Sequence, residues 1–456
     1  RHLSAALFAM LSAQALLSAP ALDGKAVAFR ELNNGLRVIV KPEDATDLVA
    51  IALYVRAGTI TEQGWPDGIS GVVQEVLFEG PDEGKAAKIR KRLEILGGRL
   101  TSGVTRDFTH VHLAIASAYL EEALEMFAEL VGDRAFAPTI VHAVRETVQG
   151  QLRAERGDPR AIPLRMMRRL WQLAYEKHPY GKALRGTSES MGEITHTRAA
   201  EYYERFYAPG NMSLLVVGAV TPGEAVATAA NTLGRLPRRD VRWPRPEPEP
   251  PQTNTRKDTV LVTPRPHAFM MAFHGPGIDD KRDVCAMDVI YTILGQGERS
   301  RLLRALRDEQ KVVLAAEVEF ITRRDPGLFI VTCIAAPGRD LAAQEGVLQQ
   351  IQRLADEPLR PDELAAAKKL LRDAYAFSNE TLADQTGSMG FYDSIDTYKF
   401  AIDYIAEVNK VTVKDVQRTV RRYLRPDAYT LVVARPAASG AVKEASLQRW
   451  PHAPDA

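Results

Sequence analysis

Histidine side chains are the most direct candidates for chemistry in this sequence, because imidazole nitrogens bind metals and transfer protons near neutral pH. His110 and His112 lie two residues apart in a predicted strand, so both point to one face as a possible pair of metal ligands. No cysteine or second histidine pair lies near them in the sequence, and an exposed strand face is the favoured interpretation. His142 and Glu146 lie four residues apart on a predicted helix, which is typical of a surface pair.

Other catalytic signatures and a nucleic-acid surface are not found in the sequence. It contains no G-x-S-x-G nucleophile elbow, no phosphate-binding Walker loop and no dinucleotide fingerprint. Lysine and arginine number 59 and aspartate and glutamate 58 among the 456 residues, so the formal net charge is +1. A chain without a positive excess is not expected to bind nucleic acid.

The segment 1–21 is predicted to be a secretory signal peptide. It has a basic start, an apolar middle and a small-residue end, Ala19-Pro20-Ala21. We therefore expect a periplasmic or secreted protein. No transmembrane segment is expected after signal removal, because no other stretch approaches about 18 apolar residues. An oxidising compartment allows Cys285 and Cys333 to pair, but their apolar surroundings favour buried free thiols.

A proline-rich segment at 237–257 is predicted to be a semi-rigid linker, because proline removes backbone donors and favours extended chain. The halves at 24–236 and 258–436, followed by a tail at 437–456, show the same order of strands, helices, strands, helices and a final strand. The predicted fold is an α+β duplication, each half a β-sheet packed with helices. Strands are predicted at 35–40, 49–55, 108–115, 212–218, 259–262, 268–273, 312–320, 327–335 and 428–433, and helices at 69–77, 86–96, 118–131, 139–154, 283–294, 299–307, 340–355 and 361–377.

Several motifs, taken in order along the chain, resemble those of one peptidase family. They are LNNGLRV at 32–38, GISGVVQEVLFEG at 68–80, HPYG at 178–181, YAPGN at 207–211, LRDEQ at 306–310 and PDELAAAKK at 361–369. The series resembles the inverted-zincin metallopeptidases of the pitrilysin and insulinase type, and most of all bacterial relatives of the mitochondrial processing peptidase. The resemblance spans nearly the whole chain after the signal segment. It implies a clam-shaped fold of two homologous halves.

The resemblance also implies a zinc site that this chain has lost. Family members carry H-x-x-E-H on one helix, where the histidines bind zinc and the glutamate activates the bound water, and a later glutamate is the third ligand. Gly71 and Glu75 stand here at the histidine positions, Gln74 at the base and Gln151 at the third ligand. Glycine has no donor, an amide is a poor ligand and base, and one carboxylate does not hold a catalytic zinc. We therefore expect no metal and no catalytic residue in this chain, and no peptidase activity when it is alone.

Two peptide-binding elements are implied by the same resemblance. The family's edge strand, which takes up peptides as an added strand, corresponds to Leu100, Thr101 and Ser102, with serine where the family usually has asparagine. In the second half, Arg307 matches an arginine that binds the peptide backbone, but Leu314 stands where the family has its companion tyrosine. Arg307 either binds a substrate carbonyl or carboxylate, or pairs with a nearby acid.

A chain of this family without zinc ligands is expected to be the non-catalytic subunit of a periplasmic zinc endopeptidase. In that interpretation it helps to form the chamber and binds peptide substrate beside a zinc-bearing sister subunit, as a heterodimer or a dimer of heterodimers. The zinc would belong to the partner. The alternatives are an independent peptide-binding or scaffold protein of the same fold and an active metallopeptidase with an unrecognised site.

Overall fold

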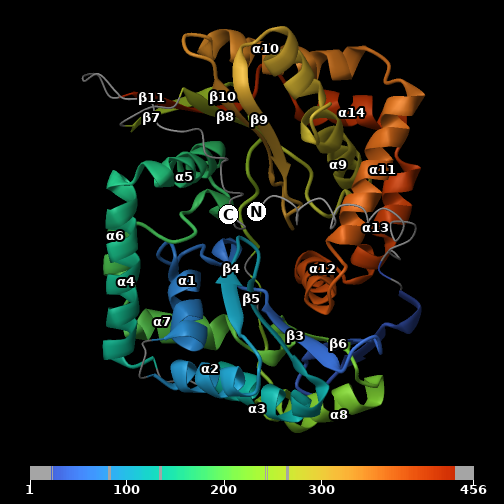
Figure 1. The fold of residues 1–456 in the computed structure, drawn as a ribbon. Helices are drawn as coiled ribbons and strands as arrows, with labels where there is room; N and C mark the ends of the chain where they lie inside the picture. The colour runs from blue at the N-terminus through green and yellow to red at the C-terminus, as the bar shows by residue number, and fades with distance from the viewer. Residues whose placement is uncertain are drawn as a thin grey trace, which may run out of the picture.

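The computed structural model describes residues 22, 24–80, 84–132, 136–241, 243, 245–262 and 267–436. In this part of the chain two β-sheets are each packed with helices, and the two units are stacked on one another in Figure 1. The arrangement confirms the predicted α+β fold class. The predicted signal peptide at 1–21 and the tail at 437–456 lie outside the described residues.

The first sheet is built around strands that are buried on both faces. Its strand order is β1-β2-β6-β3-β5-β4, and only β2 and β6 run parallel. The central strands β3 and β6 are buried along almost their whole length, which explains their continuous apolar sequences. The strands are β1 Ala28–Glu31, β2 Arg37–Pro42, β3 Leu48–Val55, β4 Thr101–Val104, β5 Thr109–Ala116 and β6 Met212–Gly218.

The second sheet repeats the topology of the first. Its strand order is β7-β11-β8-β10-β9, and only β7 and β11 run parallel. This order matches β2-β6-β3-β5-β4 strand for strand, so the predicted duplication is confirmed, with β1 as an addition to the first sheet. The strands are β7 Arg256–Val262, β8 Ala268–His274, β9 Val313–Phe320, β10 Leu328–Ala335 and β11 Thr430–Pro436.

The helices include those predicted and also α6 to α8, α12 and α13, which the sequence pattern did not predict. Threonine side chains at 187, 381 and 412 accept backbone N–H bonds at the starts of α6, α12 and α14, which fixes where these helices begin. The predicted helices at 69–77 and 299–307 contain the π-helical turns Glu75–Glu79 and Leu303–Glu309. The helices are α1 Ile69–Gln74, α2 Lys85–Ile95, α3 Leu120–Gly132, α4 Pro138–Gly157, α5 Ile162–Ala174, α6 Ser188–Glu193, α7 His196–Phe206, α8 Pro222–Asn231, α9 Lys281–Gly295, α10 Asp340–Asp356, α11 Pro361–Phe377, α12 Leu382–Ile395, α13 Lys399–Lys410 and α14 Val413–Tyr423.

The two halves exchange one helix each. Helix α5, which precedes the linker, packs on β7, β8 and β11, and its Trp171 shares an apolar cluster with Met270. In return α12, from the second half, packs on β3 and β6, and Met389 shares a cluster with Leu215 (Figure 1). A Cβ atom on Gly390 would lie 2.0 Å from the ring of Tyr54, so only glycine allows this approach of α12 to the first sheet. Each sheet therefore has a face that is packed against a helix from the other half.

Asp393 anchors α12 to the first sheet. Its side chain is fully buried, and its carboxylate accepts hydrogen bonds from Arg37 Nη2 at 2.5 Å and Ser213 Oγ at 2.6 Å. Arg56 Nη2 donates to the backbone carbonyl of Asp393 at 2.9 Å. A buried carboxylate is stable only when donors satisfy it, so these first-half groups fix the position of the second-half helix.

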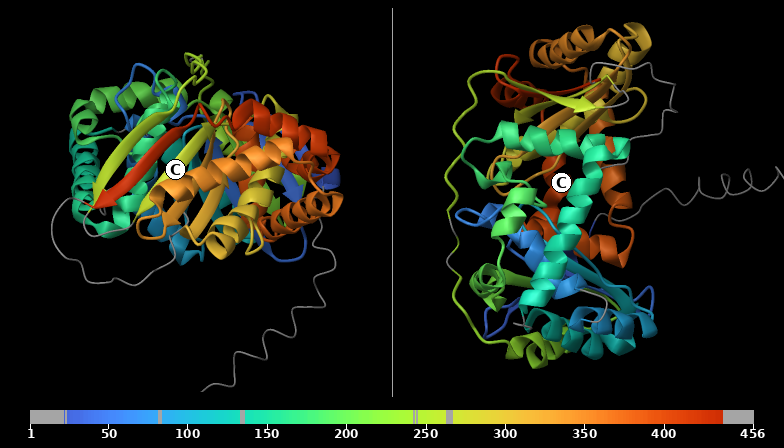
Figure 2. Two further views of the ribbon diagram at one scale, coloured as in Figure 1. Left: turned by 90° about the horizontal axis from the view of Figure 1, so that it is seen from above. Right: turned by 90° about the vertical axis from the view of Figure 1, so that its left-hand side faces the viewer.

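The proline-rich segment runs extended along one side of the molecule (Figure 2). The carboxylate of Glu249 accepts the backbone N–H groups of residues 176, 177 and 178 at 2.8, 2.9 and 3.0 Å. Trp243 Nε1 donates to Asn211 Oδ1 at 2.8 Å. The segment is therefore fastened to the first half, and Arg256 and Lys257, which the prediction assigned to the linker, already belong to β7.

Two further expectations concern the cysteines and the membrane. Cys285 on α9 and Cys333 on β10 are both buried free thiols, as predicted. Burial raises the pKa of both thiols, so neither is a ready nucleophile. Among the described residues, no helix combines the length and apolar character needed to cross a bilayer.

Replacing Asp393 by alanine should destabilise the protein strongly. The substitution leaves Arg37 and Ser213 without their buried acceptor, and breaking such a buried ion pair costs about 3–5 kcal/mol. Asp427→Ala, which removes an exposed pair with Arg425, should have a far smaller effect on the free energy of unfolding. Urea unfolding measures both variants, and equal effects would contradict the anchoring role of Asp393.

Candidate functional site

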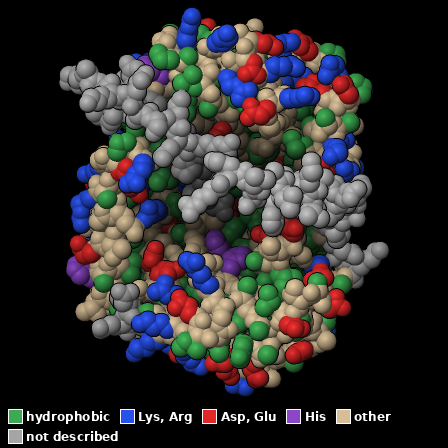
Figure 3. Space-filling view, viewed as in Figure 1, with side chains coloured by type: hydrophobic (Ala, Val, Ile, Leu, Met, Phe, Trp, Pro, Cys, Tyr) green, Lys and Arg blue, Asp and Glu red, His purple; other side chains and the backbone are tan. Residues whose placement is uncertain are grey.

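The sequence-predicted positions on α1 and β4 meet at one cavity, which is lined by residues of the first half. The cavity has a volume of about 550 Å³, and Gly71, Gln74 and Glu75 line it together with Ser102 and His110. Arginines at 106, 168 and 185 complete its charged lining. Figure 3 shows a face of the molecule with a hollow between the two halves, and histidine side chains lie at the floor of that hollow. The fold therefore joins two elements that lie far apart in the sequence.

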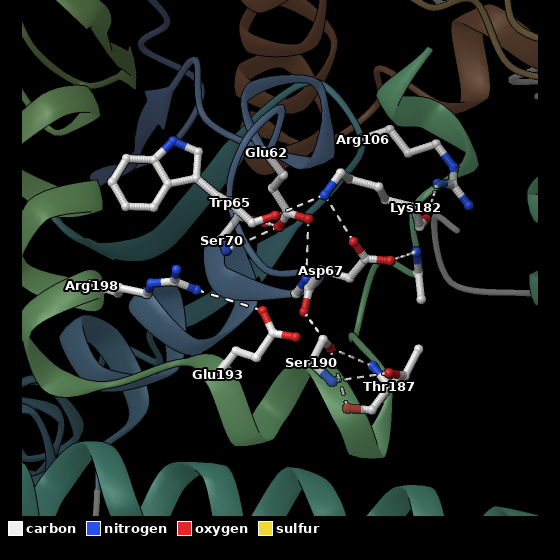
Figure 4. Close-up of polar contacts among 12 residues, drawn as sticks. Glu62, Trp65, Asp67, Ser70, Arg106, Lys182, Thr187, Ser190, Glu193 and Arg198 are labelled. Carbon is white, nitrogen blue, oxygen red and sulfur yellow. Dashed lines mark hydrogen bonds and ion pairs between the residues drawn. The ribbon is translucent and has the colours of Figure 1, made fainter. Parts of the chain in front are cut away.

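Glu62 positions helix α1, which carries two of the four altered positions, Gly71 and Gln74, and leads directly into the third, Glu75. Its fully buried carboxylate accepts the backbone N–H of Gly68 at 3.0 Å, the backbone N–H of Ser70 at 3.1 Å and the Ser70 hydroxyl (Figure 4). Gly68 has φ +83°, and a Cβ atom there would lie 2.5 Å from the backbone nitrogen of Gly186. Glycine is therefore required where the chain turns into α1.

A second set of contacts holds the turn before α1 against the segment 182–190. Lys182 Nζ pairs with Asp67 at 2.8 Å and donates to the carbonyl of Trp65 at 2.8 Å, and Ser190 Oγ donates to the carbonyl of Asp67 at 2.8 Å (Figure 4). Burial raises the pKa of Glu62 to about 7, although its hydrogen bonds act in the opposite direction. The start of α1 thus rests on a buried acid that titrates near neutral pH.

Gln74 links α1 to the edge strand. Its side-chain amide donates to Ser102 Oγ at 2.8 Å, and that hydroxyl donates to Glu79 Oε1 at 2.7 Å. Glu79 is paired in turn with Arg90 on α2. Where the family has its general base, this chain therefore has a neutral amide that is already engaged in a structural hydrogen-bond chain.

Glu75 and Gln151 do not complete a ligand set. Glu75 is half-buried, and burial and the neighbouring Glu79 raise its pKa, opposed by Arg185. The Gln151 side-chain oxygen accepts from Arg185, which also pairs with Glu155 at 3.0 Å. The position of the third ligand is therefore engaged by an arginine.

The residues present do not fit a catalytic zinc. Gly71 supplies no donor, the Gln74 amide is held by Ser102, and Gln151 is held by Arg185, which leaves Glu75 alone. Within the described ranges, no group of three or more His, Cys, Asp or Glu side chains is arranged to hold a metal ion. Gly71 nevertheless has room, because its Cβ would lie 3.7 Å from Leu184 O and from a Val104 methyl group.

The predicted peptide-binding strand lies at the edge of the first sheet. Within the part of the chain that the structure describes, β4 pairs only with β5, and the exposed or half-buried residues Thr101 and Ser102 lie on it beside the cavity. Leu100 precedes the strand and is buried in the apolar core of the first half. An unpaired strand edge is the geometry that peptide addition needs. Peptide binding at these residues stays a prediction.

Arg307 lies outside this cavity lining. It lies on the π-helical turn Leu303–Glu309 and pairs with Asp308 at 2.7 Å and Glu298 at 2.8 Å. These acids raise its pKa further, so it stays a cation. Leu314 is 47% exposed on the edge strand β9. The structure thus shows the pairing alternative for Arg307, and a substrate contact stays a prediction.

His110 and His112 do not form an exposed strand face. Tyr54 Oη lies 3.0 Å from His112 Nε2, and burial and the adjacent His110 lower the pKa of His112 to about 3. The two rings are 5.1 Å apart and face the cavity side of β5. His112 is therefore a neutral, partly buried ring that contacts Tyr54 of β3. The alternation of β5 predicts a shared face for the two rings but not what covers that face.

Sequence reasoning missed the buried charges at the junction of the two hairpins. Asp107, in the β4–β5 turn, pairs with Arg323 of the β9–β10 turn at 3.7 Å, and both side chains are 1% exposed. Tyr180 donates to the same carboxylate, and His178 pairs with Asp325 at 3.0 Å. A signal was present, because Thr-Arg-Asp at 105–107 and Thr-Arg-Arg-Asp at 322–325 occupy equivalent turns.

Comparisons with known protein families and relatives agree on one family. Residues 37–188 match the family described as Insulinase (Peptidase family M16), and residues 193–371 match the Peptidase M16 inactive domain. The chain is similar to the zinc protease PqqE of Helicobacter pylori, with 23% identity over 410 residues, which covers 89% of this chain and 92% of that protein. It is also similar to an uncharacterized zinc protease of Mycobacterium leprae, with 24% identity over 417 residues, covering 90% and 91%.

Solved structures show the same fold. A protease from Helicobacter pylori superimposes with a TM-score of 0.83 at 21% identity, covering 90% of this chain and 99% of that one. The peptidase M16 inactive domain from Pseudomonas fluorescens superimposes with a TM-score of 0.79 at 23% identity, covering 91% and 100%. The periplasmic protease PqqL from Escherichia coli superimposes with a TM-score of 0.72 at 16% identity, and the match covers 91% of this chain but 48% of that one.

Glu62→Gln should flatten the pH dependence of stability. The folded protein keeps the proton on Glu62 up to pH about 7, whereas the unfolded chain loses it near the ordinary value of 4.5. The free energy of unfolding therefore falls by about 3 kcal/mol as pH rises from 4.5 to 7. Comparing urea unfolding of both proteins across this range isolates Glu62 from other acids. Identical slopes would contradict the assignment.

Restoring the ligands should restore zinc binding. We expect the natural chain to retain no zinc after dialysis, and Gly71→His/Glu75→His/Gln151→Glu to bind one equivalent, because all three ligand positions of the family then carry zinc-binding side chains. The matched variant with Gly71→Ala in place of Gly71→His lacks one ligand and should bind at least about tenfold more weakly. Metal analysis and competition with a chelating dye measure both. One tightly held zinc in the natural chain would contradict this interpretation.

Proposed function

The chain belongs to the M16 family of pitrilysin- and insulinase-like peptidases, and on that premise we propose that it is a non-catalytic, peptide-binding subunit. It acts beside a zinc-bearing homologous subunit, which supplies the metal and the general base. Its own part is to form one wall of the chamber and to hold an extended peptide along β4.

The observation that carries this proposal is the contrast between the lost ligands and the retained groove. Gly71, Gln74 and Gln151 remove the donors of the metal site, yet Gly71 and Gln74 line a cavity of about 550 Å³ beside an unpaired edge strand. The Gln74 to Ser102 hydrogen bond holds that strand against α1. A site that has a peptide-binding surface but no zinc ligands and no general base fits a subunit that binds substrate beside a catalytic partner.

A similar structure with a chain about twice as long supports the proposal that this chain acts with a second M16 subunit. This chain aligns over 91% of its length with 48% of the PqqL chain, so the longer chain has room for a second unit of this size. A separate M16 chain would supply that second unit here, as a heterodimer or a dimer of heterodimers. The expected signal segment at 1–21 and the periplasmic description of PqqL support a periplasmic or secreted location.

The proposal predicts peptide cleavage only in the presence of a zinc-bearing homologue. The purified chain should not cleave an unfolded peptide by itself, and it should copurify with an M16 homologue from the same organism whose H-x-x-E-H motif is intact. The complex should cleave the peptide faster than the homologue alone. Chromatography with mass spectrometry identifies the partner, and a fluorogenic peptide assay measures the rate.

Matched variants of the two subunits test which of them carries the general base for peptide cleavage. Glu75→Gln in this chain should leave the rate of the complex within about twofold, because Glu75 performs no proton transfer, whereas removing the base of the homologue should abolish cleavage. Cleavage by the purified chain that Glu75→Gln abolishes would overturn the proposal. A stable monomer that binds peptide without any partner would instead favour an independent peptide-binding or scaffold protein.

A further inference from the structure

A second cavity, of about 560 Å³, lies beside the first and is unusually rich in arginine. It is enclosed by α4, α5, β7 and the segment leading into α6, on the side of the molecule where Figure 1 labels these helices. Four arginines line it, Arg156, Arg165, Arg168 and Arg169. It shares Glu155 and Arg168 with the cavity at α1, so the ion pair between them forms part of both walls.

The carboxylates that line this cavity already form ion pairs or hydrogen bonds with neighbouring residues. Glu155 pairs with Arg168 at 2.6 Å and is shared with Arg185 at 3.0 Å, and Asp258 pairs with Arg169. Glu189 accepts local hydrogen bonds that lower its pKa, with Arg156 as the weakest contributor. Five arginines, those four and Arg185, therefore face three carboxylates.

Arg156 and Arg165 form no ion pair with a carboxylate among the described residues, although Arg156 lies near enough to Glu189 to contribute to the lowering of its pKa. Arg156 Nη2 donates to Ser188 Oγ at 3.4 Å. Arg165 is half-buried, and its guanidinium donates only to the carbonyls of Arg156 and Leu261, at 3.5 and 3.3 Å. These are long, neutral hydrogen bonds for groups that prefer bidentate pairing with an anion.

We propose that this cavity binds a small molecule carrying two anionic groups, phosphoryl or carboxylate, through Arg156 and Arg165. The guanidinium fork of each arginine matches the oxygens of one such group. The volume is in the range of small-molecule sites and exceeds what one phosphate fills. Arg168 and Arg169, each already paired, set the positive field that attracts the ligand. The inference does not depend on the proposed peptidase role.

Isothermal titration of the full chain at 150 mM salt tests the site, with inorganic pyrophosphate, citrate and inorganic phosphate as probes. Pyrophosphate or citrate should bind at least about tenfold more tightly than phosphate, because two groups are held instead of one. A preference for pyrophosphate identifies phosphoryl groups as the ligand chemistry, and a preference for citrate identifies carboxylates.

Two double variants test whether Arg156 and Arg165 bind the ligand. Arg156→Gln/Arg165→Gln should weaken binding about a hundredfold, with about tenfold from each lost charged donor set. Arg153→Gln/Arg30→Gln removes the same charge from exposed positions outside the cavity, on α4 and β1, and should bind like the natural chain. The proposal is overturned if no probe binds, or if both double variants bind equally well.

Discussion

The exchange of helices between the halves is the constraint on which the rest of the structure depends. Each sheet has one face that only a helix of the other half covers, α5 on the second sheet and α12 on the first. Asp393 is buried without a counter-charge unless Arg37 and Arg56 reach it, and Asp107 depends in the same way on Arg323. These pairs fix the distance between the hairpin turns, and with it the position of one half relative to the other.

The residues at the positions of the family's metal site form a hydrogen-bonded contact between α1 and β4. In the family, the first and last positions of the motif bind zinc, but here the helix is tied to the edge strand by Gln74, Ser102 and Glu79. This hydrogen-bond chain, which ends at the ion pair of Glu79 with Arg90, holds α1 against β4 without a metal, and its Gln74 amide does not polarise a peptide carbonyl as a metal does. The residues that replace the family's zinc ligands therefore leave the edge of β4 beside the cavity.

Much of this was predictable from the sequence, and the remainder has a physical reason. The apolar runs of β3 and β6 predict buried strands, and the repeated element order predicts two similar sheets. The altered motif predicts the residues around α1, which the cavity brings together. Periodicity gives the apolar face of a helix but not its partner. It therefore does not predict that α5 packs on the sheet of the other half, or that α12 contacts β5. The pairing of Arg307 with Glu298 depends on a turn that no local pattern specifies.

The central claim is that a chain without its zinc ligands still binds peptide as an added strand at β4. Hydrogen–deuterium exchange of the natural protein, with and without an unstructured peptide, tests it most directly. The account predicts that the amides of Thr101–Val104 become protected when peptide is present, while those of the other edge strand in the first sheet, β1, do not change. Peptide binding that leaves β4 unprotected would contradict it.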